Sequence, residues 1–229
     1  MIYLQDLFSN PAIETISITA VIDTALCVGA DSSSETLTEQ PIVRTADNKL
    51  LIRASQIKRC LRHECEKIAR GLGWPICQSS NAKTMCPQRT GFSEEEAKGL
   101  EREEYRVPND NRYHCLICQM FGNSTLPSQI IFDDLICEKE PENLSEVLHP
   151  NVTINCDRCT LKDKKHYLLE TSPANAKLRF KGDIHLQPDF PPDAKAIILA
   201  GLHQINALRG SKSARLGWVQ WEFKRFCLK

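Results

Sequence analysis

The sequence predicts an α+β domain, because strand patterns of period two are interleaved along the chain with helix patterns of period 3.6. Apolar and polar residues alternate in three segments that we interpret as half-buried strands, residues 14–23, 177–186 and 218–223. Helical spacing of apolar residues marks two further segments, one starting at Ser55 and one following Pro191-Pro192-Asp193. With 229 residues and 41% hydrophobic composition, the chain can bury a core as a single domain, residues 1–229.

The first strand is predicted to bury Ile16, Ile18, Ala20 and Ile22 on one face. A Ser-, Thr- and Asp-rich loop over residues 29–40 leads to a short second strand around residues 41–44, and a turn follows at residues 47–48. These features place a long polar loop between the first two strands.

The first helix is predicted to have Ser55 as its N-cap and to end at Gly71 and Gly73. Lys58 and Arg62 are four residues apart, so they project from the same side of the first two turns. This position is close to the positive end of the helix dipole. We therefore expect the pair to hold a phosphate group.

The later elements complete the α+β order. Residues 130–132 form a short β-type run, residues 177–186 have one apolar and one basic face, and Gly210 is predicted to close the second helix. The order is strand, strand, helix, insertion, strands, helix, strand. This order is the split βαβ pattern that ferredoxin-like and RRM-like folds share.

A cysteine-rich insertion occupies about residues 74–120, where no apolar period is sustained. Cys115 and Cys118 have the Cys-x2-Cys spacing of a zinc knuckle, and Cys77 and Cys86 complete a set of four thiolates, with His114 as a possible substitute ligand. A structural zinc would supply folding free energy that this polar segment lacks. Within the insertion, residues 93–106 are charged and are interpreted as a solvated face or a short helix.

The remaining cysteines and the chain termini bear on the cellular compartment. The N-terminal ten residues lack a basic segment followed by an apolar segment, and no apolar run approaches the roughly 20 residues of a membrane span. We expect a cytoplasmic protein, in which paired cysteines hold metal more often than they form disulfides. Cys156 and Cys159 form a second Cys-x2-Cys without a nearby partner pair, which favours free thiols over a second metal.

A basic, glycine-containing segment follows the second helix. Lys+Arg and Asp+Glu are both 29, so a nucleic-acid site must come from local clustering of charge. Gly210, Lys212, Arg215 and Gly217 lie between the helix and the last strand, where glycines let backbone N–H groups approach an anion. From these residues alone, an anion-binding loop and a capped helix with a solvated turn are equally compatible.

This segment, Leu208-Arg-Gly-Ser-Lys-Ser-Ala-Arg-Leu-Gly217, resembles the glycine-rich signature of the RAMP superfamily, the repeat-associated proteins of CRISPR effector complexes. Two further matches occur in the same order. Residues 51–62 resemble the family's helix-opening segment, although Arg53-Ala54 stands where Pro-Gly is common and Arg59 replaces a glycine. Residues 115–124 are similar to its cysteine-knuckle and Phe-Gly sequence, so the resemblance covers nearly the whole chain.

The resemblance implies a ferredoxin-like or RRM-like palm, a thumb hairpin at about residues 150–176 and the zinc-binding insertion. It also implies a backbone subunit of a type III CRISPR effector complex that stacks along guide RNA with other RAMP subunits and positions target RNA. The RNA-binding residues implied are Arg44, Arg53, Lys58, Arg62, Arg158, Gly210, Lys212, Arg215 and Gly217.

Two enzymatic alternatives stay open. The family's acidic-x-Pro pattern matches Glu39-Gln-Pro41, which puts Glu39 where relatives that cleave target RNA usually have aspartate. The same subunit would then be an endoribonuclease with Glu39 in proton transfer or positioning. A guide-RNA-processing endonuclease is the third reading, and it ranks below the others because the six histidines form no recognisable pairing.

Overall fold

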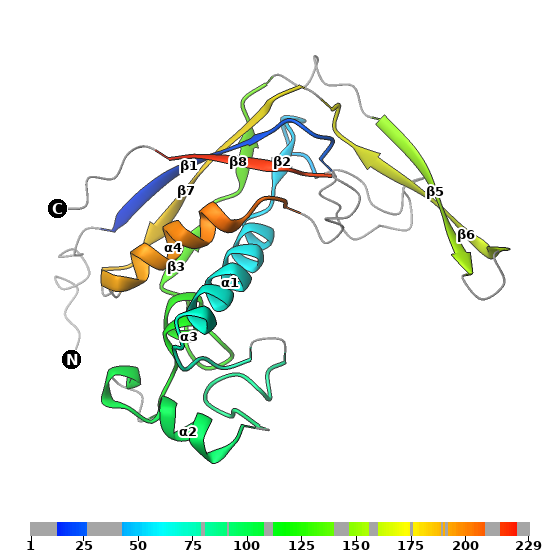
Figure 1. The fold of residues 1–229 in the computed structure, drawn as a ribbon. Coiled ribbons are helices and arrows are strands. Elements are labelled where there is room, and N and C mark those ends of the chain that lie inside the picture. The colour runs from blue at the N-terminus through cyan, green and yellow to red at the C-terminus, as the bar shows by residue number, and fades with distance from the viewer. Residues whose placement is uncertain are drawn as a thin grey trace. The chain divides into compact units, whose positions relative to one another are not determined.

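The computed structural model describes residues 13–26, 43–78, 81–90, 92–107, 112–139, 147–155, 160–174, 176–188, 190, 192–208 and 216–223. For residues 149–155 and 160–169 we consider the backbone alone. Figure 1 shows the elements, whose bounds are β1 Glu14–Ile22, β2 Leu51–Ile52, α1 Ala54–Gly71, α2 Glu94–Leu100, η2 Glu103–Tyr105, α3 Leu116–Phe121, β3 Ile130–Phe132, β4 Leu135–Cys137, β5 Val147–Asn155, β6 Thr160–Thr171, β7 Leu178–Leu186, α4 Pro192–Gln204 and β8 Val219–Phe223. The α+β prediction is confirmed.

The main sheet has the strand order β2-β4-β7-β1-β8, and β3 pairs separately with β7. The pairs β1–β8, β2–β4, β3–β7 and β4–β7 are antiparallel. In the β1–β8 pair, Ile18 lies opposite Phe223 and Ile22 lies opposite Val219. The first and last strands of the chain are therefore neighbours, as the split βαβ order requires.

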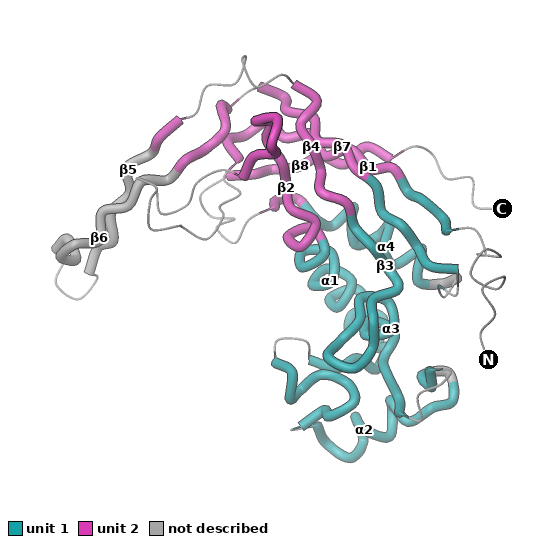
Figure 2. The backbone as a smooth tube through the Cα atoms, turned by 180° about the vertical axis from the view of Figure 1, so that it is seen from behind, with its two compact units in different colours: residues 1–16, 58–132, 183–205 teal, residues 17–57, 133–182, 206–229 magenta. Residues whose placement is uncertain are grey.

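Strands β5 and β6 form a separate antiparallel hairpin with a register shift between Val152 and Ile154. Figure 2 shows the two compact units of the chain. Unit 1 comprises residues 1–16, 58–132 and 183–205, and unit 2 comprises residues 17–57, 133–182 and 206–229. No helix in the described part of the chain combines the length and apolar character that spanning a bilayer requires.

The core of unit 1 lies where α1, α3 and α4 pack together. Leu61 and Cys65 of α1 are fully buried, and the Cys65 thiol contacts the Ile197 carbonyl of α4 at 3.6 Å. A Cβ at Gly201 would come within 2.8 Å of the Cys65 sulfur, so α4 approaches α1 closely at this glycine. Burial raises the pKa of Cys65 to about 12, because desolvation disfavours the thiolate.

The core of unit 2 is built by alternating residues of its strands. Ile18, Ala20 and Ile22 of β1 are buried, as the period-two pattern predicts. Phe180 of β7 is also fully buried, whereas Arg179 beside it is exposed and pairs with Glu138 and Glu222. The basic face predicted for this strand is therefore partly neutralised by carboxylates.

Two predicted boundaries differ from the structure. The second strand of the main sheet is β2 at Leu51–Ile52. Of the strand predicted at residues 41–44, residues 41–42 lie outside the described residues, and Arg44 forms an isolated bridge with Leu50 across the turn at residues 46–47. Helix α4 ends at Gln204, before the predicted stop at Gly210, which lies outside the described residues. Of the two readings of residues 93–106, the structure has a short helix: residues 94–100 form α2, which Ser93 and Glu96 begin with a capping box.

The N-terminus of α1 is capped from a distance. The helix begins at Ala54, so Ser55 lies inside its first turn, and the Ala54 N–H donates to the Asp134 carboxylate at 2.6 Å. Asp134 lies between β3 and β4, and its negative charge occupies the positive end of the helix dipole. The first backbone N–H of α1 thus has its hydrogen-bond acceptor in a residue 80 positions away in the chain.

We expect Gly182→Ala to destabilise the protein by about 1–3 kcal/mol, because its Cβ would lie 2.6 Å from Leu135 Cδ2 and 3.0 Å from the Asp134 carbonyl oxygen. A backbone atom cannot move away cheaply, and the displaced turn carries the α1 cap. Urea denaturation measures the change. Gly99→Ala is the control, since its Cβ would meet only Pro75 at 3.6 Å; equal stability of the two variants contradicts the prediction.

Candidate functional site

Four cysteines form a cluster in unit 1. Cys77, Cys86, Cys115 and Cys118 are buried, and their sulfur atoms all lie within 4.8 Å of one another. The Cys77 sulfur is 3.4 Å from that of Cys118 and 3.6 Å from that of Cys115. Zinc–sulfur bonds of about 2.3 Å in a tetrahedron place sulfurs about 3.8 Å apart, so the donor set fits a zinc ion.

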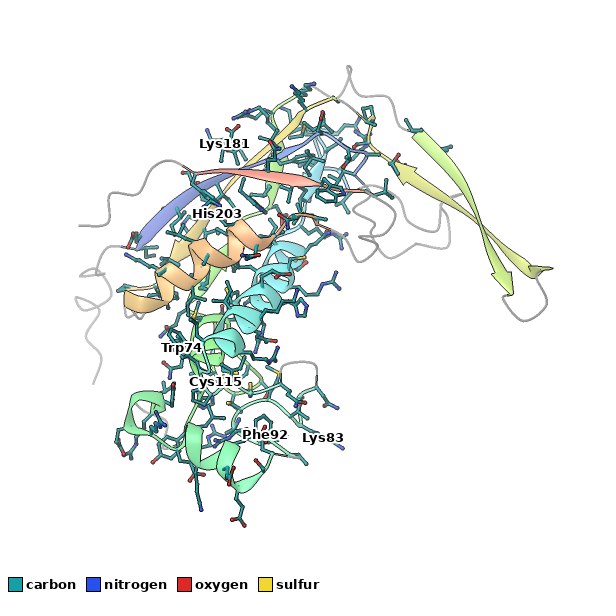
Figure 3. All side chains as sticks on the ribbon, viewed as in Figure 1. Trp74, Lys83, Phe92, Cys115, Lys181 and His203 are labelled. Carbon is teal, nitrogen blue, oxygen red and sulfur yellow. The ribbon has the colours of Figure 1, made fainter. Side chains whose placement is uncertain are left out.

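Helix α3 positions two of the four sulfurs. Cys115 is the N-cap residue of this helix, and Cys118 follows in its first turn. The Cys115 N–H also points at the Cys86 sulfur, 3.5 Å away, an arrangement that favours a thiolate there. Figure 3 labels Cys115 where the insertion meets α3.

The segment between Cys77 and Cys86 is held by its own turn. Thr84 donates to the carbonyl oxygens of Gln78 and Asn81, and the N–H of Met85 also donates to Asn81. This turn returns the chain to the cluster at Cys86, with eight residues between it and Cys77. The long spacing of the first pair is therefore accommodated by a compact turn.

The thiols of the cluster differ in acidity. Hydrogen bonds from Cys115, Cys77 and Cys86, together with the charge of Arg62, hold the pKa of Cys118 well below its usual range. The hydrogen bond to Cys118 raises the pKa of Cys115 in turn. His114 is buried but its Nδ1 lies 3.0 Å from the Asn123 amide, and the ligand group contains the four cysteines without it.

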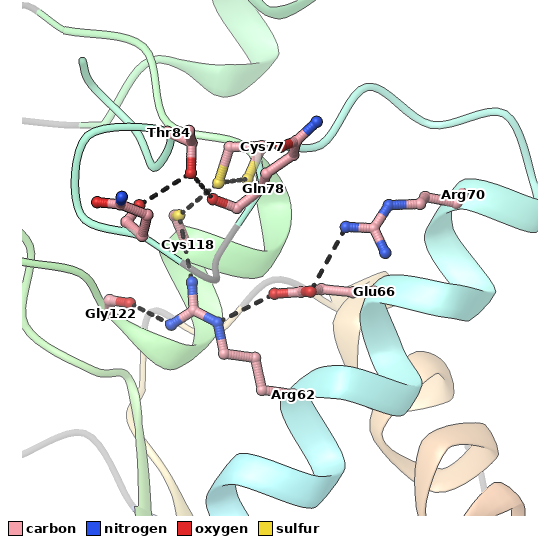
Figure 4. Close-up of polar contacts among 10 residues, drawn as sticks. Arg62, Glu66, Arg70, Cys77, Gln78, Thr84, Cys118 and Gly122 are labelled. Carbon is pink, nitrogen blue, oxygen red and sulfur yellow. Dashed lines mark hydrogen bonds and ion pairs between the residues drawn. The ribbon is translucent and has the colours of Figure 1, made fainter. Parts of the chain in front are cut away.

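The side chain of Arg62 reaches the cluster from α1. Its guanidinium donates to the Glu66 carboxylate at 3.2 Å, to the Gly122 carbonyl at 2.8 Å and to the Cys118 sulfur at 3.6 Å. Figure 4 shows these contacts, with Arg70 on the other side of Glu66. Arg62 was predicted to bind a phosphate group, but all three of its guanidinium nitrogens have hydrogen-bond partners within the chain.

A second group of contacts joins the ends of several loops in unit 2. Leu26, at the end of the described chain after β1, donates its N–H to the Ser172 hydroxyl and accepts from the Ser172 N–H, both at 2.9 Å. Ser172 directly follows β6 of the hairpin and is buried. The last described residue before the segment that contains Glu39 therefore contacts the residue that follows the hairpin.

The glycine-containing segment is anchored beside the same residues. Leu208 donates to the Gly217 carbonyl at 3.0 Å, and the Gly217 N–H donates to Ala25 at 2.9 Å. Trp218 donates its N–H to Thr24, and a Cβ on Gly217 would lie 3.4 Å from Leu26. Gly217 has a φ of 67°, which favours glycine at this crossing.

Helix α1 contacts this group as well, because the Gln56 amide donates to the carbonyl of Leu208. We call the contacts among residues 24–26, Gln56, Ser172, Leu208, Gly217 and Trp218 the loop junction. The loop junction joins Leu208 to Gly217, the described residues on either side of residues 209–215, and it holds Leu26, the last described residue before residues 27–42. All of its members belong to unit 2.

The other predicted site residues have varied positions. Arg53 is exposed, and Arg44 donates to the Asn48 carbonyl. Lys58 is half-buried, and desolvation and then the charge of Arg62 lower its pKa. The remaining residues lie outside the described part of the chain, namely Glu39, Arg158, Gly210, Lys212, Arg215, Cys156 and Cys159.

Sequence reasoning missed three residues of the loop junction. Ser172 belongs to no motif, and Gln56 lies in the helix-opening segment without a role assigned to it. Their partners lie 146 and 152 positions away, so local patterns did not show these contacts. Trp218 was assigned only to a strand, yet its side chain is 50% exposed at the end of the glycine-containing segment. The sequence places a tryptophan directly after the basic segment, and its exposure in the structure would allow base stacking.

Comparisons with known proteins bear on these sites. A family model described as the RAMP superfamily matches residues 19–204. The chain belongs to the RAMP superfamily. No curated protein matches this RAMP chain in sequence.

One solved structure similar to this RAMP protein is described as the type III-B Cmr-beta complex bound to cognate target RNA. The TM-score is 0.54 and the identity is 15%, and the match covers 97% of this chain. The RAMP chain spans 62% of the length of the solved chain. The likeness supports an α+β fold of the kind found in that complex.

Replacing Ser172 with alanine removes the acceptor for the buried Leu26 N–H. We expect a loss of about 1–3 kcal/mol in the free energy of unfolding, the cost of an unsatisfied buried donor. Chemical denaturation followed by circular dichroism measures this loss. The exposed Ser55 provides the control variant Ser55→Ala. A Ser172→Ala protein as stable as this control would show that the loop junction does not depend on the hydroxyl.

Proposed function

We propose that this RAMP protein is a guide-RNA-binding subunit of a type III CRISPR effector complex, with target RNA and other RAMP subunits as partners. The observation that carries the proposal is the loop junction. It joins described residues beside three segments that carry predicted site residues: residues 27–42 with Glu39, residues 209–215 with Gly210, Lys212 and Arg215, and the β5–β6 hairpin with Arg158. Convergence of three such segments favours one shared ligand.

In this proposal the main sheet with α1 and α4 is an RRM-like palm, and the β5–β6 hairpin is the thumb. The strand order β4-β7-β1-β8, with α1 between β1 and β4 and α4 between β7 and β8 in the chain, supports an RRM-like palm. Membership of the RAMP superfamily and likeness to a chain of a target-RNA-bound type III-B complex support the assignment. A protein with these partners would work in the cytoplasm.

Binding is proposed to rest on phosphate contacts that do not read bases. Glycine backbone at Gly210 and Gly217 would approach the RNA chain, and cations would neutralise it. The cations that remain candidates are Arg44, Arg53, Lys58, Arg158, Lys212 and Arg215. Arg53 is exposed to solvent, and partial burial makes the positive charge of Lys58 costly. An anion could contact the first residue and would stabilise the charge of the second.

The four-cysteine cluster is proposed to hold a structural zinc ion. Four buried thiols at these distances fit a closed tetrahedral site, which leaves no coordination position open for catalysis. The metal would organise the insertion, about residues 74–120, whose short helix α2 buries only Leu100. The zinc thus has a folding role in the proposal.

A second candidate function is cleavage of target RNA by the same subunit. The junction favours it, because the loop that carries Glu39 starts at Leu26, beside the base of the glycine-containing segment. A carboxylate held there would accept or orient the proton of a 2′-hydroxyl. Glu39 is the residue proposed for this step.

Charge reversal in the glycine-containing segment tests RNA binding. We expect Lys212→Glu with Arg215→Glu to weaken binding of the full chain to a fluorescein-labelled single-stranded RNA of about 40 nucleotides by at least tenfold, and to flatten its salt dependence. Fluorescence anisotropy at several salt concentrations measures both. Lys98→Glu in α2 is the control. Unchanged affinity and salt slope in the double variant would contradict RNA binding by this segment.

The cleavage alternative requires the reconstituted complex with a labelled guide-complementary RNA. We expect Glu39→Ala to abolish one set of cuts at matched assembly if this subunit supplies the carboxylate, since its removal withdraws the proton acceptor. Glu35→Ala, which changes another acid of the same loop, is the control. A cleavage pattern identical in the Glu39 variant and the native complex assigns the subunit a scaffolding role only.

A further inference from the structure

Arg62 was expected from sequence to contact RNA phosphate, but its surroundings are those of the cysteine cluster. Its side chain is 17% exposed, and each guanidinium nitrogen faces an acceptor in unit 1. A cation with a full set of intramolecular partners has little left to offer an external anion. Its contacts therefore need another explanation.

Two of the three groups that accept hydrogen bonds from Arg62 belong to helix α3 and its C-cap, which carry the cluster residue Cys118. Cys118 is a member of the ligand set, and Gly122 is the C-cap residue of α3, whose N–H returns to the Cys118 carbonyl. The Arg62 guanidinium spans both ends of this single helical turn at 3.6 and 2.8 Å. It therefore fixes where the Cys118 sulfur lies relative to α1.

Charge gives a second reason for the arrangement. Four thiolates around a divalent ion leave about two negative charges, which are costly in a buried site without nearby cations. Arg62 supplies a positive charge at the Cys118 sulfur, and Glu66, 5% exposed, is shared between Arg62 and Arg70. Arg62, Glu66 and Arg70 together carry a net charge of +1, and Arg62 is the member that contacts the cluster.

We propose that Arg62 is a positioning residue of the metal centre, which holds the Cys118 thiolate by an N–H···S hydrogen bond and ties the knuckle to α1. This role rests on the proposed zinc site. It removes Arg62 from the RNA-binding set and keeps Lys58 of α1 in that set. Partners that orient metal ligands in this way commonly change metal affinity by about 10- to 100-fold when removed.

The test compares the full chain with Arg62→Met, which keeps the length of the side chain without its charge and donors, and Arg62→Lys, which keeps the charge. Zinc content is measured after dialysis, and zinc release is followed with a chromogenic chelator in excess. We expect one zinc per wild-type chain, release about 10-fold faster or more from Arg62→Met, and an intermediate rate from Arg62→Lys. Arg59→Met, an exposed neighbour in α1, is the control and should release zinc at the wild-type rate.

A spectroscopic measurement separates this role from general loosening of the fold. In protein loaded with Co²⁺, the thiolate-to-cobalt charge-transfer band reports the electron density on sulfur, so loss of the N–H···S bond should shift it in both Arg62 variants but not in Arg59→Met. If Arg62→Met does not fold, the band and release rate of Arg62→Lys decide. Wild-type release and an unshifted band in the folded variants overturn the proposal.

The outcomes for zinc and for RNA are independent. A wild-type chain without zinc overturns the metal site and this role of Arg62 together, whatever its affinity for RNA. Loss of RNA affinity in Arg62→Lys beyond that of the Arg59→Met control, with zinc release unchanged, would instead return Arg62 to the phosphate contacts. RNA binding that stays at the wild-type level while release accelerates is the expected pattern.

Discussion

The reciprocal pair of hydrogen bonds between Leu26 and Ser172 is the constraint on which the functional part of unit 2 depends. Both residues are buried, so their backbone groups cannot turn to water and must be satisfied locally. The two hydrogen bonds between these residues fix the position where the chain leaves β1 relative to the position where it leaves β6. The neighbouring bonds from Gly217 to Ala25 and from Trp218 to Thr24 extend this order to the base of the glycine-containing segment.

Periodicity predicted the elements that have a buried face of their own, because burial leaves a repeating mark on the sequence. Strands β1 and β7 and helix α1 are of this kind. The short strands β2 and β4 escaped, since two or three residues such as Leu51 and Ile52 cannot establish a period. The start of α1 was misassigned to a Ser55 cap because its cap, Asp134, comes from a distant turn.

The candidate sites divide in the same way. The four cysteines were predicted because thiolate ligands are identified by residue type and spacing, and their sulfurs do meet. The environment of Arg62 was not predictable, because helix spacing shows which face a residue occupies but not what packs against it. Lys58 and Arg62 share one side of the helix, yet Arg62 is oriented toward Cys118 and Gly122.

The cluster also has a consequence for how the insertion can vary among relatives. Cys86 and Cys115 are 29 positions apart in the chain but adjacent at the cluster, so the segment between them leaves and re-enters the protein at one place. Closing a longer loop at such a point costs only about 0.6 kcal/mol for each doubling of length. The cysteines thus make this segment interchangeable: evolution can lengthen it, shorten it or exchange its content while the helices beneath it keep their packing.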